Sequence, residues 1–181
     1  MNSALFLDRD GVINVDYGYV HTAEKTRFVS GIFSLVQAAN EIGMKVVVVT
    51  NQAGIGRGLY SEPQFFNYMN WVKQEFVRNG AHLDAVYYCP HHPDAGKGEY
   101  MRKCACRKPQ PGMFLQAARE HMIDLSQSVM VGDSASDAEA ASAAGVKHIY
   151  LLGSHESSHA TRNFELLSDV QSAITEMRVA R

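Results

Sequence analysis

The sequence lacks several features that would assign a protein to a special class. No apolar run approaches the roughly 20 residues of a membrane-spanning helix. The N-terminus has no basic segment followed by a long apolar stretch, which a secretory signal would require. The formal net charge of -2 gives no electrostatic reason for nucleic acid or an acidic membrane to bind. We therefore expect a cytoplasmic protein with no nucleic-acid or membrane partner.

Cysteine is also scarce, with three residues in 181, and all three lie close together. An odd number of cysteines is a poor disulfide framework, and clustered thiols in a reducing compartment more often bind a metal. A Cys-x-His motif at 89–91 and a Cys-x-Cys motif at 104–106 offer three thiolates and one imidazole, which complete a closed tetrahedral zinc site. We expect structural zinc in a loop at 89–106. The expected ligands are Cys89, His91, Cys104 and Cys106, with His92 as a rival to His91.

What is present is typical of a soluble globular protein, with 46% hydrophobic and 20% charged residues. We expect a single domain over residues 1–181 and a monomer. Short apolar runs predict strands at 4–8, 45–50, 85–88, 128–132 and 147–152. Helical spacing predicts helices at 32–42, from Ser61 to about 76, at 112–121, at 135–144 and from a cap at Ser168. This alternation predicts an α/β fold, a three-layer, doubly wound parallel sheet with helices on both faces.

Polar side chains follow several of the predicted strands directly. The carboxyl ends of parallel strands meet at one edge of a sheet, where ligands bind, so we expect these residues to converge on one site. The members of this set are Asp8 and Asp10 after the first strand, Thr50, Asn51 and Gln52 after the second, Asp133 and Asp137 after the fourth, and Arg107 and Lys108 before the third helix. Each has a purely structural alternative, such as a helix cap for Asp133, but their shared location favours function.

This inventory matches what phosphoryl transfer requires. One carboxylate can attack phosphorus, and a second acid can protonate the leaving oxygen and later activate water. Carboxylate oxygens suit Mg²⁺, while Lys108 and Thr50 can stabilise the phosphoryl oxygens. A phospho-accepting receiver domain of a signalling protein would also place acids, a threonine and a lysine at strand ends. A zinc-stapled binding module with an inactive site is a third possibility.

Four ordered motifs resemble those of the haloacid dehalogenase superfamily. They are Asp8-Arg9-Asp10-Gly11-Val12, Val49-Thr50-Asn51, Arg107-Lys108-Pro109 and Gly132-Asp133-Ser134-Ala135-Ser136-Asp137. The resemblance implies a Rossmann-like core without a separate cap domain. It implies Asp8 as nucleophile, Asp10 as general acid and base, and Thr50 and Lys108 as phosphoryl stabilisers. It also implies Mg²⁺ on Asp8, on the backbone carbonyl of Asp10 and on Asp133, with Asp137 outside the ligand set.

The zinc loop narrows the resemblance to the heptose 1,7-bisphosphate phosphatases, with histidinol-phosphate phosphatases as relatives. The family pattern favours His91 over His92 as the ligand. It implies hydrolysis of the 7-phosphate of D-glycero-D-manno-heptose 1,7-bisphosphate in lipopolysaccharide precursor synthesis, or of histidinol phosphate or another small phosphorylated metabolite. The implied substrate contacts are Arg9, Asp16, Tyr17, Gly18, Tyr19, Asn51, Gln52, Ala53, Arg107 and Lys108, with Arg107 also serving catalysis. Ser134 replaces a lysine common in heptose members, and Arg57 is either a contact for a distal phosphate or a solvated loop residue.

Overall fold

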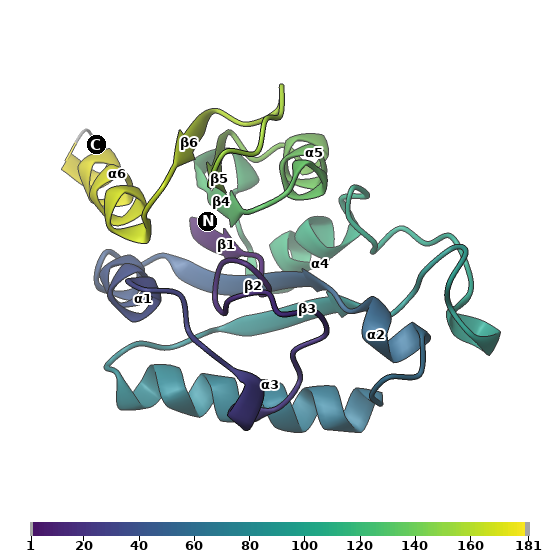
Figure 1. Ribbon diagram of the computed structural model, residues 1–181. Helices are drawn as coiled ribbons and strands as arrows, with labels where there is room; N and C mark the ends of the chain where they lie inside the picture. The colour runs from purple at the N-terminus through teal and green to yellow at the C-terminus, as the bar shows by residue number, and fades with distance from the viewer. Residues whose placement is uncertain (1, 180–181) are drawn as a thin grey trace.

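The computed structural model describes residues 2–179, which build one six-stranded parallel sheet in the order β3-β2-β1-β4-β5-β6 (Figure 1). The α/β prediction is confirmed, and every strand pair is parallel. The strands are β1 (Ala4–Leu7), β2 (Lys45–Asn51), β3 (Ala85–Cys89), β4 (Val129–Gly132), β5 (His148–Leu152) and β6 (Arg162–Phe164).

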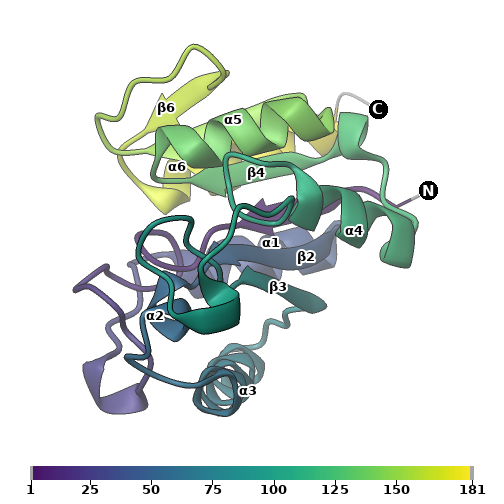
Figure 2. The ribbon, with the colours of Figure 1, turned by 90° about the vertical axis from the view of Figure 1, so that its right-hand side faces the viewer.

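Helices cover both faces of this sheet. The α-helices are α1 (Ile32–Glu41), α2 (Ala53–Gly56), α3 (Glu62–Arg78), α4 (Gly112–His121), α5 (Ala135–Ala144) and α6 (Leu167–Val179), and the 3-10 turns are η1 (Ala23–Lys25), η2 (Gly98–Tyr100) and η3 (Leu125–Gln127). Side chains alternate along β1: Leu5 and Leu7 pack with α1, α3 and α6, while Ala4 and Phe6 pack with α4 and α5. In Figure 2, α4 and α5 lie toward the viewer and α1 and α6 lie behind the sheet.

The predicted elements agree with the structure to within about one residue at most ends. Strand β6, helix α2 and the three short 3-10 turns were not predicted. Strand β6 has exposed residues at two of its three positions and therefore lacks an apolar run, and α2 is a single turn that contains two glycines. The predicted cap at Ser168 is wrong, because α6 begins at Leu167 and Ser168 lies within its first turn.

The order of the strands places a switch point between β1 and β4. The chain runs outward from β1 through β2 and β3 on one side, and from β4 through β5 and β6 on the other. In such sheets the crevice at the carboxyl ends of the strands at this point is where ligands bind. Within residues 2–179, no helix has the length and apolar content needed to span a bilayer.

Candidate active site

A tight turn follows β1 and carries the first two candidate carboxylates. The backbone N–H of Asp8 donates to the carbonyl of Val131 at 3.0 Å, so β1 and β4 remain joined as the turn begins. The Arg9 carbonyl accepts the backbone N–H of Ile13 at 2.8 Å and closes the turn. Gly11 has a φ of +87°, and a Cβ there would overlap the carboxylate of Asp133. Glycine at this position therefore lets the two strand ends approach closely.

A cleft of about 420 Å³ opens at the carboxyl ends of β1, β2 and β4. Such a volume falls in the range of small-molecule sites. Its walls are formed by Asp8, Asp10, Asp16, Gly18, Tyr19, Asn51, Gln52, Ala53, Gly54, Tyr60, Arg107, Lys108, Asp133, Ser134, Ser136 and Asp137. The structure thus brings together most of the residues singled out from the sequence. Gly54, Tyr60 and Ser136 had no expected contact with substrate or metal.

Three predicted residues are absent from the walls of this cleft. Arg9 is completely buried beneath it, contrary to the substrate contact expected from the sequence. Tyr17 is 60% exposed and lies away from the walls, again unlike the expectation. Thr50 is 1% exposed, at the end of β2 just behind Gln52. Adjacency in sequence to a cleft residue therefore does not guarantee access to the cleft.

Lys108 lies buried between two carboxylates. Its Nζ is 2.8 Å from Asp8 Oδ1 and 2.6 Å from Asp137 Oδ1, and it donates to the carbonyl of Val49 at 2.9 Å. Three acceptors match the three hydrogens of an ammonium group. Burial alone would lower the pKa of Lys108, but the charges of Asp137 and Asp8 raise it above its usual value. The lysine therefore remains cationic at neutral pH.

One lysine does not balance the three carboxylates gathered here. Carboxylate oxygens of Asp8, Asp133 and Asp137 all lie within 4.8 Å of one another. Burial raises the pKa of Asp8 to about 8, and the charge of Asp137 adds to this despite Lys108. Burial, followed by Asp137, also raises the pKa of Asp133 to about 6. A divalent cation would relieve this repulsion, and an all-oxygen donor set fits Mg²⁺.

Asp137 has its hydrogen-bonding capacity largely filled by the protein. Its Oδ2 accepts the backbone N–H groups of Asp133 and Ser134, both at 3.1 Å, and the hydroxyl of Ser134 at 2.8 Å. Its Oδ1 faces Lys108. Asp137 thus caps α5 and fixes Asp133 and Lys108. Ser134 takes part in the capping box of α5.

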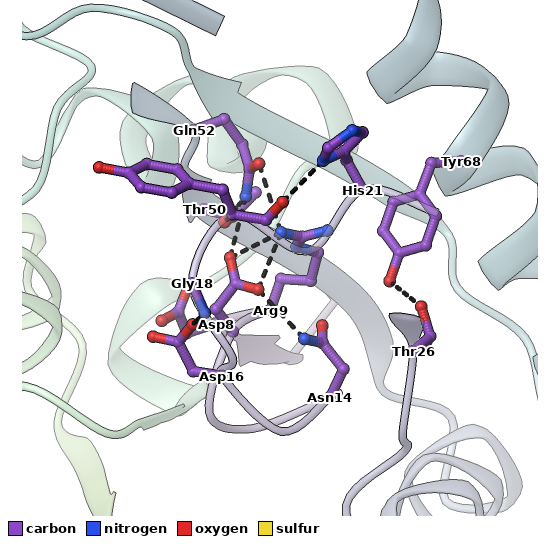
Figure 3. A network of polar contacts seen from close by, with 12 residues as sticks. Asp8, Arg9, Asn14, Asp16, Gly18, His21, Thr26, Thr50, Gln52 and Tyr68 are labelled. Carbon is purple, nitrogen blue, oxygen red and sulfur yellow. Dashed lines mark hydrogen bonds and ion pairs between the residues drawn. The ribbon is translucent and has the colours of Figure 1, made fainter. Parts of the chain in front are cut away.

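The carboxylate of Asp10 accepts hydrogen bonds from a polar network that includes Arg9, Asn14 and Gln52, which are labelled in Figure 3. Nη2 of Arg9 donates to both of its oxygens, at 2.8 and 2.7 Å. Asn14 donates to Oδ1 at 3.1 Å and Gln52 to Oδ2 at 3.2 Å. Arg9 is thus a buried partner of Asp10, and its guanidinium also lies over the ring of Tyr68. These bonds keep Asp10 at the cleft wall in one orientation.

The second candidate centre is the sulfur cluster. Sγ of Cys89 lies 3.5 Å from that of Cys104 and 2.9 Å from that of Cys106, and the last two are 3.3 Å apart. Nδ1 of His91 lies 3.6 Å from Cys89 Sγ and 3.4 Å from Cys106 Sγ. Ligands at zinc distances define a tetrahedron with edges of about 3.7 Å, so this cluster needs only a slight expansion to hold zinc.

Two further observations support a metal at the sulfur cluster. The neighbouring side chains of Cys89, Cys104 and His91 lower the pKa of Cys106, which favours the thiolate form that zinc binds. Nδ1 of His92 accepts the backbone N–H groups of Asp94 and Ala95 instead of facing the sulfurs. His91 therefore completes the donor set, and His92 shapes the loop.

The sulfur cluster is joined to the cleft through the backbone. Arg107 and Lys108 directly follow Cys106 in the chain, and Arg107 Nη1 donates to the carbonyl of His91 at 3.2 Å. The side chain of Asn51 clamps Lys108, donating to its carbonyl at 3.1 Å and accepting its N–H at 3.0 Å. Asn51, expected to contact the substrate, thus uses its amide to position Lys108.

Comparisons with known proteins agree with this geometry. A family model described as HAD-hydrolase-like matches residues 105–173. The D-glycero-beta-D-manno-heptose-1,7-bisphosphate 7-phosphatase of Vibrio cholerae is 52% identical over 143 residues, 79% of this chain and 77% of the relative. The D-glycero-alpha-D-manno-heptose-1,7-bisphosphate 7-phosphatase of Burkholderia mallei is 51% identical over 157 residues, 87% and 83% of the two chains.

A solved structure shows the same fold. The D,D-heptose 1,7-bisphosphate phosphatase from B. bronchiseptica, complexed with magnesium and phosphate, superposes with a TM-score of 0.83 at 30% identity. The match covers 96% of this chain and 98% of that protein. The similarity therefore extends over the sheet, the cleft and the sulfur loop together.

Proposed function

Because the chain belongs to the family of D-glycero-D-manno-heptose-1,7-bisphosphate 7-phosphatases, we propose that it hydrolyses the 7-phosphate of that heptose bisphosphate. It is a phosphatase of the haloacid dehalogenase type. The observation that carries the proposal is the cleft in which Asp8, Asp10, Lys108 and Asp133 meet at the switch point of the sheet. The product would serve the synthesis of lipopolysaccharide precursors.

In the first step, a carboxylate oxygen of Asp8 attacks phosphorus. The bond between phosphorus and the sugar oxygen breaks, and Asp10 gives its proton to that oxygen, which leaves as an alcohol. The phosphoryl group is then carried on Asp8 as an acyl phosphate. Asp10 lies two residues from Asp8 on the same turn and lines the same cleft. A nucleophile and a proton donor that act on the same ester bond require this proximity.

In the second step, water replaces Asp8 at phosphorus. Asp10, now a carboxylate, takes a proton from the water whose oxygen attacks phosphorus, and the bond to Asp8 breaks. Phosphate and the original carboxylate of Asp8 result. We assign the stabilisation of the phosphoryl oxygens to the ammonium of Lys108, and the family motif adds the hydroxyl of Thr50, which lies buried behind the cleft wall. Lys108 is well placed because it already contacts Asp8.

The residues present fit both metals that the family implies. Asp8, Asp133 and the backbone carbonyl of Asp10 would hold Mg²⁺, which supplies positive charge to the transferred phosphoryl oxygens. Cys89, His91, Cys104 and Cys106 would hold a structural zinc ion. The closed sulfur set leaves no open position for a reactant, so its contribution is to fix the loop.

For the remainder of the substrate, we assign recognition to the loop at 16–19 and to Arg107. Asp16, Gly18 and Tyr19 line one side of the cleft, and Arg107 lines the other. The Arg107 guanidinium is anchored through one nitrogen to His91, which leaves further donors for an anionic group. Tyr17 and Arg9 are not included in this assignment, given where the structure places them.

The substrate test compares phosphate release from both anomers of D-glycero-D-manno-heptose 1,7-bisphosphate and from histidinol phosphate, in the presence of Mg²⁺. Phosphorus NMR identifies which phosphate leaves the sugar. We expect kcat/KM for one heptose anomer to exceed that for histidinol phosphate by about 100-fold or more. A preference for histidinol phosphate, or release of the 1-phosphate, would contradict the proposal.

A further inference from the structure

The side chain of Gln52 is almost fully buried, although its position in the sequence suggested a substrate contact. Only 2% of this residue is exposed. Its backbone N–H donates to the carbonyl of Cys89 at 2.7 Å, which fixes the turn between β2 and α2. The amide group points back toward the turn after β1 (Figure 3). What this amide contacts therefore indicates its role.

Both ends of the amide are occupied by protein groups. Oε1 accepts the hydroxyl of Tyr60 at 2.5 Å and faces Nη2 of Arg9 at 3.4 Å. Nε2 donates to Oδ2 of Asp10 at 3.2 Å and to Oγ1 of Thr50 at 2.8 Å. A buried glutamine with all of its bonds directed to protein groups has little capacity left for a ligand.

The orientation of the amide is determined by its neighbours. Burial raises the pKa of Tyr60 to about 12, so its hydroxyl keeps its proton and acts as a donor. The guanidinium of Arg9 is a donor as well. Two donors on one side require the carbonyl oxygen there, and the amide nitrogen must then face Asp10 and Thr50. Because Thr50 accepts this bond, its own hydroxyl proton stays available to another acceptor.

The surroundings of Tyr60 show that this arrangement is built into the fold. A Cβ at Gly54 would overlap the Tyr60 ring, so glycine is needed for the ring to approach. The ring of His21 stacks on Tyr60, with centroids 4.4 Å apart and planes 15° apart. His21 in turn contacts the carbonyl of Tyr19 through Nδ1 at 2.7 Å. Tyr60 is thereby held between α2 and the loop that lines the cleft.

We propose that Gln52 is a positioning residue, whose amide, oriented by Tyr60, holds the carboxylate of Asp10 where it exchanges protons with the substrate oxygen. The inference rests on the proposed function, because it takes Asp10 as the general acid and base. It changes the role of Gln52 from a substrate contact to a support for catalysis. It also assigns Tyr60 an indirect effect on Asp10, which acts through the orientation of the Gln52 amide.

The test uses Gln52→Glu, which keeps the acceptor for Tyr60 but loses both donors and places a like charge beside Asp10. Two probes are compared, heptose 1,7-bisphosphate and para-nitrophenyl phosphate, whose phenolate departs without protonation. We expect kcat/KM for the sugar phosphate to fall about 10- to 100-fold, with KM within about twofold of the parent. For the nitrophenyl ester, the fall should be less than about threefold.

Gln64→Glu is the matched control. Gln64 is exposed at the start of α3, and its Oε1 accepts the backbone N–H of Ser61, a bond that glutamate retains. The same chemical change at this position should leave both probes unaffected. Equal losses on the two probes with Gln52→Glu would indicate general damage to the fold and overturn the inference. A raised KM with unchanged kcat would do the same, because it would make Gln52 a substrate contact.

Tyr60→Phe provides a second test if Gln52→Glu does not fold. It removes one hydroxyl and should reduce kcat/KM for the sugar phosphate about 3- to 10-fold, with a smaller effect on the nitrophenyl ester. The loss should disappear when Gln52→Met is already present; equal losses in both backgrounds would show that Tyr60 acts independently and contradict the inference. Asp10→Asn separates the two levels. Full sugar-phosphate activity in that variant would refute Asp10 as the general acid and base, whereas no phosphate release from heptose 1,7-bisphosphate by the parent protein would refute the proposed function itself.

Discussion

The carboxylate cluster and the sulfur cluster gather metal-binding side chains in opposite ways. Asp8 and Asp133, with Asp137 beside Asp133, come from two distant parts of the chain, are partly balanced by Lys108, and line an open cleft. The four sulfur-cluster ligands come from one loop and form a complete tetrahedral set. Hard oxygen donors that leave one side of the cluster open suit Mg²⁺ at a site where a substrate reacts. Soft donors that fill the coordination sphere suit a zinc ion that stabilises the fold. We infer from this contrast that the carboxylate cluster performs the reaction and that the sulfur cluster supports the fold.

The two clusters are nevertheless mechanically connected. Lys108 lies two residues after Cys106, and the carbonyl of Cys89 accepts the backbone N–H of Gln52. The sulfur loop thus fixes both the lysine that faces Asp8 and the turn that supports Asp10. Damage to the sulfur cluster should lower stability first and activity second. Damage to the carboxylate cluster should lower activity alone.

The largest effect is expected for Asp8→Asn. Asparagine keeps an oxygen that can accept from Lys108 but cannot form the acyl phosphate, so kcat should fall by more than about 1000-fold. The melting temperature should not fall, because the change removes a buried carboxylate whose charge is costly. Steady-state kinetics and calorimetry check both parts. Residual activity of more than a few per cent would exclude Asp8 as the nucleophile.

The next effect concerns the sulfur cluster and compares two neighbouring histidines. His91→Ala removes the proposed zinc ligand and should lower the free energy of unfolding by about 3 kcal/mol or more, which lowers the melting temperature by about 6–12 °C. His92→Ala loses only bonds to two backbone N–H groups and should cost about 1 kcal/mol. Thermal unfolding of both variants, together with measurement of their zinc content, tests these two expectations. Equal losses, or full zinc content in His91→Ala, would refute the assigned ligand set.

A smaller effect tests the connection between the clusters. Asn51→Ala removes the clamp on the backbone of Lys108 and should reduce kcat about tenfold. Asn40 is a matched control, because it clamps the backbone of His82 with the same pair of bonds far from the cleft. Asn40→Ala should cost similar stability, about 1–2 kcal/mol, with unchanged kcat. A raised KM with normal kcat in Asn51→Ala would instead make it a substrate contact.

The smallest effect is a pH dependence of the metal-free protein. The pKa of Asp8 is about 8 in the folded state against 3.8 as its usual value, so unfolding releases a proton between these limits. This contribution to stability is therefore present below about pH 4 and is lost as the pH rises toward 8. Added Mg²⁺ competes with that proton. It should raise the melting temperature more at pH 8 than at pH 5.5, and an equal or smaller rise at pH 8 would contradict the account.

Much of this arrangement was predictable because strong local signals coincide with strand ends. Runs of buried residues define β1, β2 and β4, and parallel packing then brings Asp8, Asn51 and Asp133 together. The sulfur cluster was also predictable, because the Cys-x-His and Cys-x-Cys motifs are a local signal of their own. Strand β6 gave no such signal, because it lies at a sheet edge and is mostly exposed.

The supports beneath the cleft were not predictable from local pattern. Arg9 looked accessible among charged residues, yet its burial depends on Tyr68 from α3, almost 60 positions later in the chain. Tyr60 belongs to no motif, and its place follows from its contacts with Gln52, His21 and Gly54 in the folded protein. Such roles depend on tertiary packing between elements, which periodicity and spacing do not encode.

The central assignment is that Asp8 carries the phosphoryl group while Asp10 moves protons. Asp10→Asn with para-nitrophenyl phosphate tests it most directly, because that leaving group departs without an acid but breakdown of the acyl phosphate still lacks its base. We predict a burst of about one nitrophenolate per enzyme, followed by slow turnover, with the phosphoryl group found on Asp8 after acid quench and peptide mapping. Turnover without a burst, or a phosphoryl group on any other residue, would contradict the account.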